Sequence, residues 1–370
     1  RFGSTAFLDE HPWAADVGFV VNFEAVGGSG PSLVVETNGS QLAIIRGLAA
    51  AHPVAFSFLP ETVRIIGGIG TDFDPFLEAG IPGIHLAYLD GSPIYHTLHD
   101  SLDRVGMGSL YHHGAYAVAV ARHFGEADLA RLSAADDVTF FTVGRWLVVR
   151  YPEGWVVPLA LLVAALFGIS VVRRVARRES SLLALPAGVG VVVVRIVLIV
   201  IVTTLVWKGL TGFRQSPGAV ESYLYLFGLL TLSAGIWPTI FRGAPHKPAK
   251  IDIAGAVVLA WVVLAVATGF LAPGISYLFA WPALVGSLVL VAPPARGRSR
   301  MWVPGLIAFP ALVLVVPAMY VFFQMAMPRP GNTDSQMVEV IAVVILLATL
   351  VGGLVASVSH RSSKTVMTPE

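Results

Sequence analysis

From residue 155 onward, the chain consists of long apolar stretches separated by short polar loops. A transmembrane helix needs about 20 consecutive, mostly apolar residues, and an ordinary soluble domain does not contain several such runs. Over the whole chain, 55% of the residues are hydrophobic and only 13% are charged. The sequence therefore predicts a multi-pass membrane protein, for which the lipid bilayer is one partner.

The spanning-length rule predicts about seven membrane helices. They cover approximately residues 155–172, 183–207, 219–241, 251–272, 275–292, 302–323 and 337–358. Lys and Arg are concentrated in the loops that follow the first, third, fifth and last of these stretches. Because basic loops stay in the cytoplasm, this alternation predicts a cytoplasmic C-terminal tail and places residues 1–150 on the exoplasmic side. The membrane would be a bacterial plasma membrane or the endoplasmic reticulum.

The first 150 residues have the mixed pattern of an α/β sheet domain. Strands are predicted at 17–24, 32–36, 63–66 and 83–88, and helices at 39–51, 74–79 and 109–124. The β-branched and aromatic residues within 136–151 predict a juxtamembrane strand or linker. We therefore expect three parts: a partial enzyme domain at 1–127, a linker at 128–152 and a transmembrane helical domain at 153–370.

Two segments of the first part carry side chains suited to a metal. In residues 94–103 (IYHTLHDSLD), His96 stands beside Tyr95 and shortly before Asp100. In residues 21–28 (VNFEAVGG), an apolar run ends at Glu24 and is followed by glycines, as when a buried strand presents a ligand at its carboxyl end. The chain has no cysteine, so a metal would be held by His, Asp, Glu or water. These features point to zinc chemistry.

Short motifs along the first 125 residues resemble, in order, the second half of the family 28 zinc metallopeptidases of clan MH. The motifs are Phe2-Gly3-Ser4 with His11-Pro12, Asn22-Phe23-Glu24-Ala25, Glu36-Thr37, Thr71-Asp72-Phe73 with Phe76, Gly80-Ile81-Pro82-Gly83, Tyr95-His96-Thr97 with Asp100, and His112-His113-Gly114. The family includes aminopeptidases, glutamate carboxypeptidases and glutaminyl cyclases. The apolar region that follows is similar to the membrane-anchored branch typified by the endoplasmic reticulum metallopeptidase.

The resemblance implies a site with two zinc ions, in which Glu24 and His96 bind different ions. Glu24 departs from the aspartate common in soluble aminopeptidases, although a carboxylate is kept. The family's remaining ligands and its general base would fall before Arg1. We therefore expect the chain to begin inside the peptidase domain, to contain an incomplete site and to be inactive by itself, since a catalytic zinc takes about three protein ligands.

Other residues have two interpretations each. By resemblance Asp72 orients the metal ligands without binding the metal, but Thr71-Asp72 could equally be a helix N-cap. Tyr95 could donate to an oxyanion or pack in the core. His99, His112 and His113 lack a ligand spacing and are interpreted as structural.

Three functions are compatible with these features. The first is an exopeptidase that hydrolyses peptides on the exoplasmic side. The second is a catalytically dead relative that binds peptide or scaffolds a complex. The third is a transporter, for which the intramembrane Arg195 would be relevant, but the chain has no repeated half. A net charge of +1 gives no reason to expect a nucleic-acid partner, and the oligomeric state is not predicted.

Overall fold

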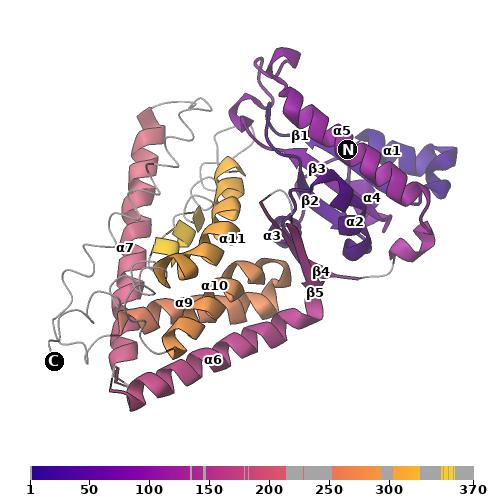
Figure 1. The fold of residues 1–370 in the computed structure, drawn as a ribbon. Helices are drawn as coiled ribbons and strands as arrows, with labels where there is room; N and C mark the ends of the chain where they lie inside the picture. Colours follow the sequence, from indigo (N-terminus) through magenta and orange to yellow (C-terminus); the bar gives the residue numbers. More distant parts are fainter. Residues whose placement is uncertain are drawn as a thin grey trace. The chain divides into compact units, whose positions relative to one another are not determined.

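The computed structural model describes residues 2–133, 136–144, 147–178, 180–181, 183–213, 228, 252–292, 303–325 and several positions between 343 and 354. The chain forms two compact units (Figure 1). The first comprises Arg1–Val156 with Ala272–Ile275, and the second comprises Val157–Leu271 with Ser276–Glu370. All of the predicted site residues lie in the first unit.

A three-stranded mixed sheet forms the centre of the first unit. Its strands are β1 (Val20–Ala25), β2 (Leu33–Asn38) and β3 (Gly83–Tyr88), in the order β1-β3-β2. β1 runs parallel to β3, and β2 runs antiparallel to it. β3 is buried along its whole length, as expected for a central strand that is covered on both faces.

Alternation along the strands gives this sheet one apolar and one polar face. Val34, Ile84 and Leu86 point to the apolar face and belong to the hydrophobic core. Helices α2 (Gln41–Leu48) and α5 (Met107–Gly125) supply most of the other core residues: Ile44, Ile45, Leu48, Tyr116, Val120 and Phe124. The polar face therefore lies opposite the two packed helices, and it carries the side chains of the candidate site.

Tyr116 joins the core to the loops around it. Its ring is fully buried, and its hydroxyl accepts a hydrogen bond from the Val54 backbone N–H at 2.8 Å and donates one to the Ser32 carbonyl at 3.2 Å. Burial raises the pKa of this phenol far above its usual value. The hydroxyl thus pairs two backbone groups that would otherwise be buried without partners.

The remaining elements of the first unit surround the sheet. They are α1 (Phe2–Glu10), α3 (Phe58–Ile65), α4 (Asp74–Glu78), β4 (Val138–Val143) and β5 (Leu147–Pro152), with 3-10 turns at Pro12–Asp16, Ala49–Ala51, Ser92–Ile94, Leu102–Arg104, Leu129–Ser133 and Glu153–Trp155. β4 and β5 form an antiparallel hairpin, and β4 adds Val138 and Phe140 to the hydrophobic core. The domain boundaries at 127 and 152 stay predictions.

Most of the expected elements occur, and the strand at 83–88 is found with the predicted bounds. The prediction of a strand at 63–66 is wrong, because residues 63–65 are the last residues of helix α3 and Ile66 is its C-cap. Phe58, Leu59 and Val63 are buried while Ile65 and Ile66 are about half exposed, which is the pattern of a helix with one apolar face. Arg64 also donates two hydrogen bonds to Glu61, one turn earlier.

The second unit is helical. Its described helices are α6 (Val156–Ala176), α7 (Ala184–Phe213), α9 (Ile253–Leu271), α10 (Pro273–Val291) and α11 (Val303–Met325). Among the described residues, four helices are long and apolar enough to cross a membrane: Glu153–Ala176, Ala184–Val206, Ile253–Leu271 and Pro273–Val291. They match four of the predicted spans, and α11 lies in a fifth.

The prediction of about seven spans is confirmed only in part. The span at 219–241 and most of the span at 337–358 lie outside the residues that the structure describes, as does the side chain of Arg195. The structure therefore supports an α-helical, membrane-associated second unit and leaves the total number of spans as a prediction.

A buried ion pair connects three helices of the second unit. Arg174, near the end of α6, donates two hydrogen bonds to Asp252, which precedes α9; the distances are 2.6 and 2.9 Å. The Asp252 carboxylate also accepts from the Gly255 backbone N–H at 2.8 Å and from the Ser180 hydroxyl at 3.0 Å, and its own N–H donates to the carbonyl of Ala184 in α7. Asp252 thereby caps the start of α9.

Candidate metal site

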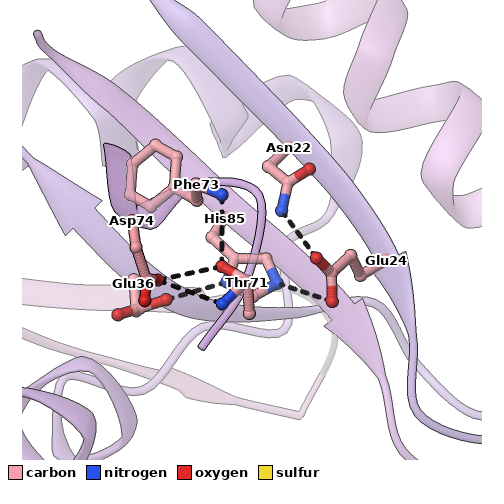
Figure 2. A network of polar contacts seen from close by, with 7 residues as sticks. All are labelled: Asn22, Glu24, Glu36, Thr71, Phe73, Asp74 and His85. Carbon is pink, nitrogen blue, oxygen red and sulfur yellow. Dashed lines mark hydrogen bonds and ion pairs between the residues drawn. The ribbon is translucent and has the colours of Figure 1, made fainter. Parts of the chain in front are cut away.

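Glu24 lies near the carboxyl end of β1, on the polar face of the sheet (Figure 2). Its partner across the parallel ladder is Ala87 of β3. The amide of Asn22, two residues earlier on the same face, donates a hydrogen bond to a Glu24 carboxylate oxygen at 3.1 Å. The side chain is 27% exposed, so the carboxylate is held by Asn22 and is still partly accessible to solvent.

The loop after β1 is held against the loop after β3 by backbone hydrogen bonds. Ser29 and Asp90 exchange a reciprocal pair at 3.1 and 2.9 Å, and Gly106 N–H donates to Gly28 C=O at 2.7 Å. A Cβ at Gly27 would collide with the Asp90 carbonyl, and one at Gly28 would come within 2.6 Å of the Arg104 carbonyl. The glycines that follow Glu24 are thus required for this close approach.

His96 lies in the loop after β3, at the same carboxyl edge of the parallel strand pair as Glu24. Its φ is +58°, a left-handed backbone conformation that few residues other than glycine adopt. The imidazole is exposed and stacks on the ring of Tyr95, with 3.7 Å between the ring centroids. The next residue, Thr97, fixes the turn by donating its hydroxyl to the Ile94 carbonyl at 2.6 Å.

Glu24 thus lies at the end of β1 and His96 lies in the loop after β3, the parallel neighbour of β1, with Tyr95 beside His96. Asp72 is placed differently: it is exposed just before α4, and its carboxylate accepts a hydrogen bond from the Ser4 hydroxyl at 3.3 Å. Of the N-cap interpretation of Thr71-Asp72, the structure shows Phe73 at the N-cap position of α4, while the Thr71 hydroxyl accepts the Phe73 N–H at 3.2 Å just before the helix. Asp74 instead accepts both the N–H and the hydroxyl of Thr71, each at 3.2 Å.

Sequence reasoning missed His85 and assigned no role to Glu36, which form the buried part of the polar face. His85 is 1% exposed, and its Nδ1 lies 2.9 Å from a carboxylate oxygen of Glu36, which is also buried. Its Nε2 lies 3.9 Å from the Glu24 carboxylate and has no hydrogen-bond partner. A histidine within the apolar run of residues 81–89 was the signal that could have identified this residue.

Two histidines of α5, His112 and His113, make contacts inside the first unit. His113 of α5 packs its ring against Phe23 and Tyr88, and burial together with the neighbouring His112 lowers its pKa to about 4. His112 Nδ1 accepts the backbone N–H of Ser32 at 3.1 Å. His99 is exposed. In the same loop, the Ser101 hydroxyl donates to Asp103 at 2.6 Å and lowers the pKa of that carboxyl.

Comparison with known families assigns the first unit. Residues 1–121 match the sequence profile described as Peptidase family M28. Residues 1–121 belong to peptidase family M28. The resemblance seen in the sequence motifs is thereby confirmed, and the M28 match covers Glu24, Asp72, Tyr95 and His96.

Relatives of the M28 domain are membrane proteins. Endoplasmic reticulum metallopeptidase 1 of Mus musculus is 34% identical over 158 residues, which are 40% of this chain and 18% of that protein. The Homo sapiens protein of the same name is 35% identical over 160 residues, 40% of this chain and 17% of that protein. A vacuolar membrane protease of Clavispora lusitaniae is 31% identical over 114 residues, 30% of this chain and 11% of that protein.

These matches support a membrane-associated metallopeptidase. The aligned region spans less than a fifth of the length of these curated relatives. No solved structure matches the chain.

The side chains of the M28 domain fit a divalent metal in part. Across the residues with described positions, no group of three or more His, Asp or Glu is placed to hold a metal ion. Two features nevertheless suit zinc: the accessible Glu24 carboxylate, and the buried His85 Nε2 that lacks a hydrogen-bond partner. Nitrogen and carboxylate oxygen are both common zinc ligands.

Proposed function

We propose that this protein is a membrane-bound zinc metallopeptidase of family M28 that hydrolyses peptides as an exopeptidase of the aminopeptidase type. Its M28 domain would lie on the exoplasmic side, and its helical unit would anchor the domain in the bilayer. The proposal is supported by the M28 match over residues 1–121 and by the position of Glu24 at the carboxyl end of β1, where the following loop is hydrogen-bonded to the loop after β3 that contains His96. Ligands and catalytic groups commonly gather at this end of the strands in α/β proteins.

Glu24 and His96 are the proposed metal ligands, one for each of two zinc ions. Asn22 orients the Glu24 carboxylate by its hydrogen bond, and the Tyr95 ring restricts the rotation of the His96 imidazole by stacking on it. The left-handed backbone of His96 is consistent with a functional constraint, because such strain persists only where the surrounding structure imposes it. When bound, zinc would polarise the peptide carbonyl and make its bound water acidic enough to act as the nucleophile.

Tyr95 and Asp72 are assigned supporting roles in this proposal. Tyr95, next to His96, could donate its hydroxyl to the oxygen that becomes negatively charged during peptide hydrolysis. Asp72 precedes α4 and would act as an outer residue that orients groups around the metal. A complete catalytic site also needs a general base and further ligands from outside the described residues.

Zinc-dependent hydrolysis of amino-terminal peptide substrates by the natural membrane protein tests this function. Glu24→Ala and His96→Ala should each lower kcat/KM by at least about 1,000-fold, since each removes a ligand of the catalytic ions. His99→Ala is the matched control, because His99 is an exposed histidine in the same loop as His96. Activity of either ligand variant within tenfold of the wild type would refute the assignment.

A second candidate is a peptide-binding scaffold that does not catalyse hydrolysis. It is favoured by one observation, the lack of a three-ligand metal group among the described side chains. Peptide binding that survives Glu24→Ala and His96→Ala, without any hydrolysis by the wild-type protein, would support the scaffold over the enzyme.

A further inference from the structure

A row of polar side chains crosses all three strands beneath Glu24. Asn22 of β1, His85 of β3 and Glu36 of β2 are ladder partners, so their side chains lie next to one another on the same face. Figure 2 shows the His85 imidazole between the carboxylates of Glu36 and Glu24. His85 and Glu36 are 1% and 6% exposed, and burying such groups is costly unless they are paired.

A β-bulge brings Glu36 into this row. Val34 pairs with Leu86 and faces the core, so regular alternation would also point residue 36 toward the core. The register shifts between Val34 and Glu36, which places Glu36 opposite His85 on the polar face. Bulges re-aim side chains and are frequent beside active sites. The backbone irregularity thus serves to put a carboxylate against the imidazole.

Hydrogen bonding assigns the tautomer of His85. Nδ1 lies 2.9 Å from a Glu36 oxygen, and an ionised carboxylate can only accept, so we assign the proton of this hydrogen bond to Nδ1. In the neutral ring, Nε2 is then an unprotonated lone pair. It is buried, has no hydrogen-bond partner and faces a Glu24 oxygen at 3.9 Å. An unprotonated Nε2 and a carboxylate oxygen are both acceptors, so a cation or a proton between them would stabilise this arrangement.

The distance favours a cation. At 3.9 Å a protonated Nε2 would form an ion pair with Glu24 but no direct hydrogen bond, so its N–H would stay without an acceptor. A tetrahedral zinc ion with bonds of about 2.0–2.2 Å holds two ligand atoms about 3.4 Å apart. The Glu24 side chain is partly exposed and needs to move by only about 0.5 Å to reach that spacing. Metal-binding histidines usually donate their other ring N–H to a carboxylate, as His85 does to Glu36.

We propose that His85 is a metal ligand beside Glu24 and that Glu36 fixes its tautomer and orientation from behind. This inference rests on the proposed function in so far as Glu24 binds the same ion. It adds a buried nitrogen to that ion's coordination, and it gives the bulge in β2 a role in metal binding.

Zinc affinity of the full chain in detergent, measured by competition with a chromophoric chelator, tests the inference. His85→Phe keeps a buried ring without the nitrogens and should raise the zinc Kd at least about 100-fold, since the loss of a ligand exceeds the effect of losing an outer partner. Glu36→Gln keeps the shape and should raise the Kd by about 10- to 100-fold. His99→Ala should leave the Kd within about twofold. With cobalt as the probe, the visible absorption bands should shift in His85→Phe and remain unchanged in His99→Ala.

The outcomes separate this inference from the proposed function. Zinc binding that is weakened by Glu24→Ala but unchanged by both His85→Phe and Glu36→Gln would overturn the role of His85 and leave the proposed function standing. If the wild-type chain takes up no zinc, or if Glu24→Ala leaves the zinc Kd unchanged, both the role of His85 and the proposed function are overturned. If His85→Phe does not fold, as judged by its melting transition, the Glu36→Gln measurement decides, because this substitution is isosteric.

Discussion

Removing the carboxylate of Asp252 should strongly destabilise the helical unit. Asp252→Ala deletes four hydrogen bonds to this side chain, two from Arg174 and one each from Ser180 and Gly255. It also leaves the guanidinium of Arg174, whose side chain is 8% exposed, without its counter-ion. Removing one partner of a buried ion pair costs about 3–5 kcal/mol, and the lost helix cap accounts for about 1 kcal/mol of this total. We expect a decrease of about 3–5 kcal/mol in the free energy of unfolding.

Reversible unfolding of the purified protein in bicelles, followed by tryptophan fluorescence during SDS titration, measures this change. The control is Arg173→Ala, which removes an exposed arginine next to Arg174 and should change the free energy of unfolding by less than about 0.5 kcal/mol. The double variant Arg174→Met with Asp252→Leu should recover most of the stability, because an apolar pair replaces both charges. A loss below about 1 kcal/mol in Asp252→Ala, or a double variant less stable than either single one, would refute the reasoning.

Three further predictions concern stability and topology. Tyr116→Phe leaves the Val54 N–H without its acceptor and should lower the free energy of unfolding by about 1–3 kcal/mol in chemical denaturation, with Tyr111→Phe at an exposed site as the control. Lowering the pH from 6.5 to about 4 should lower the melting temperature. The pKa of His113 is about 4 in the folded state and 6.5 without the fold, so the unfolded state binds the proton first and is stabilised by it. His113→Phe should reduce this pH dependence. Reporters inserted after Phe124 should be exoplasmic and those in 173–179 cytoplasmic, and the reverse pattern would invert the proposed orientation.

The strands of the sheet and helix α5 could be predicted because their signals are local. Residues 83–88 are a short apolar run between Gly80-Ile81-Pro82 and a turn, and the structure gives β3 the same bounds. The strand prediction at 63–66 failed because it also relied on a local signal. Val63, Ile65 and Ile66 have high strand propensity, but the buried face of α3 begins earlier, at Phe58 and Leu59. Four residues are too few to distinguish the two-residue repeat of a strand from the 3.6-residue repeat of a helix.

For the candidate site, the sequence pointed only to residues that stand in a recognisable local motif. Glu24 and His96 stand out in the sequence because of their neighbours, whereas Glu36 resembles the last residue of an apolar strand. Its position depends on the bulge in β2, which brings it opposite His85. That pairing arises from contacts between segments 49 residues apart and has no local sequence signal. The polar row beneath Glu24 therefore emerged only from the structure.

The most direct test of the central claim is anomalous scattering at the zinc absorption edge from crystals of the natural protein grown with zinc. The account predicts two anomalous peaks, one within about 2.0–2.2 Å of a Glu24 carboxylate oxygen and one within about 2.0–2.1 Å of a His96 ring nitrogen. Zinc peaks that are absent from both side chains while zinc occupies other residues of the M28 domain would contradict the account.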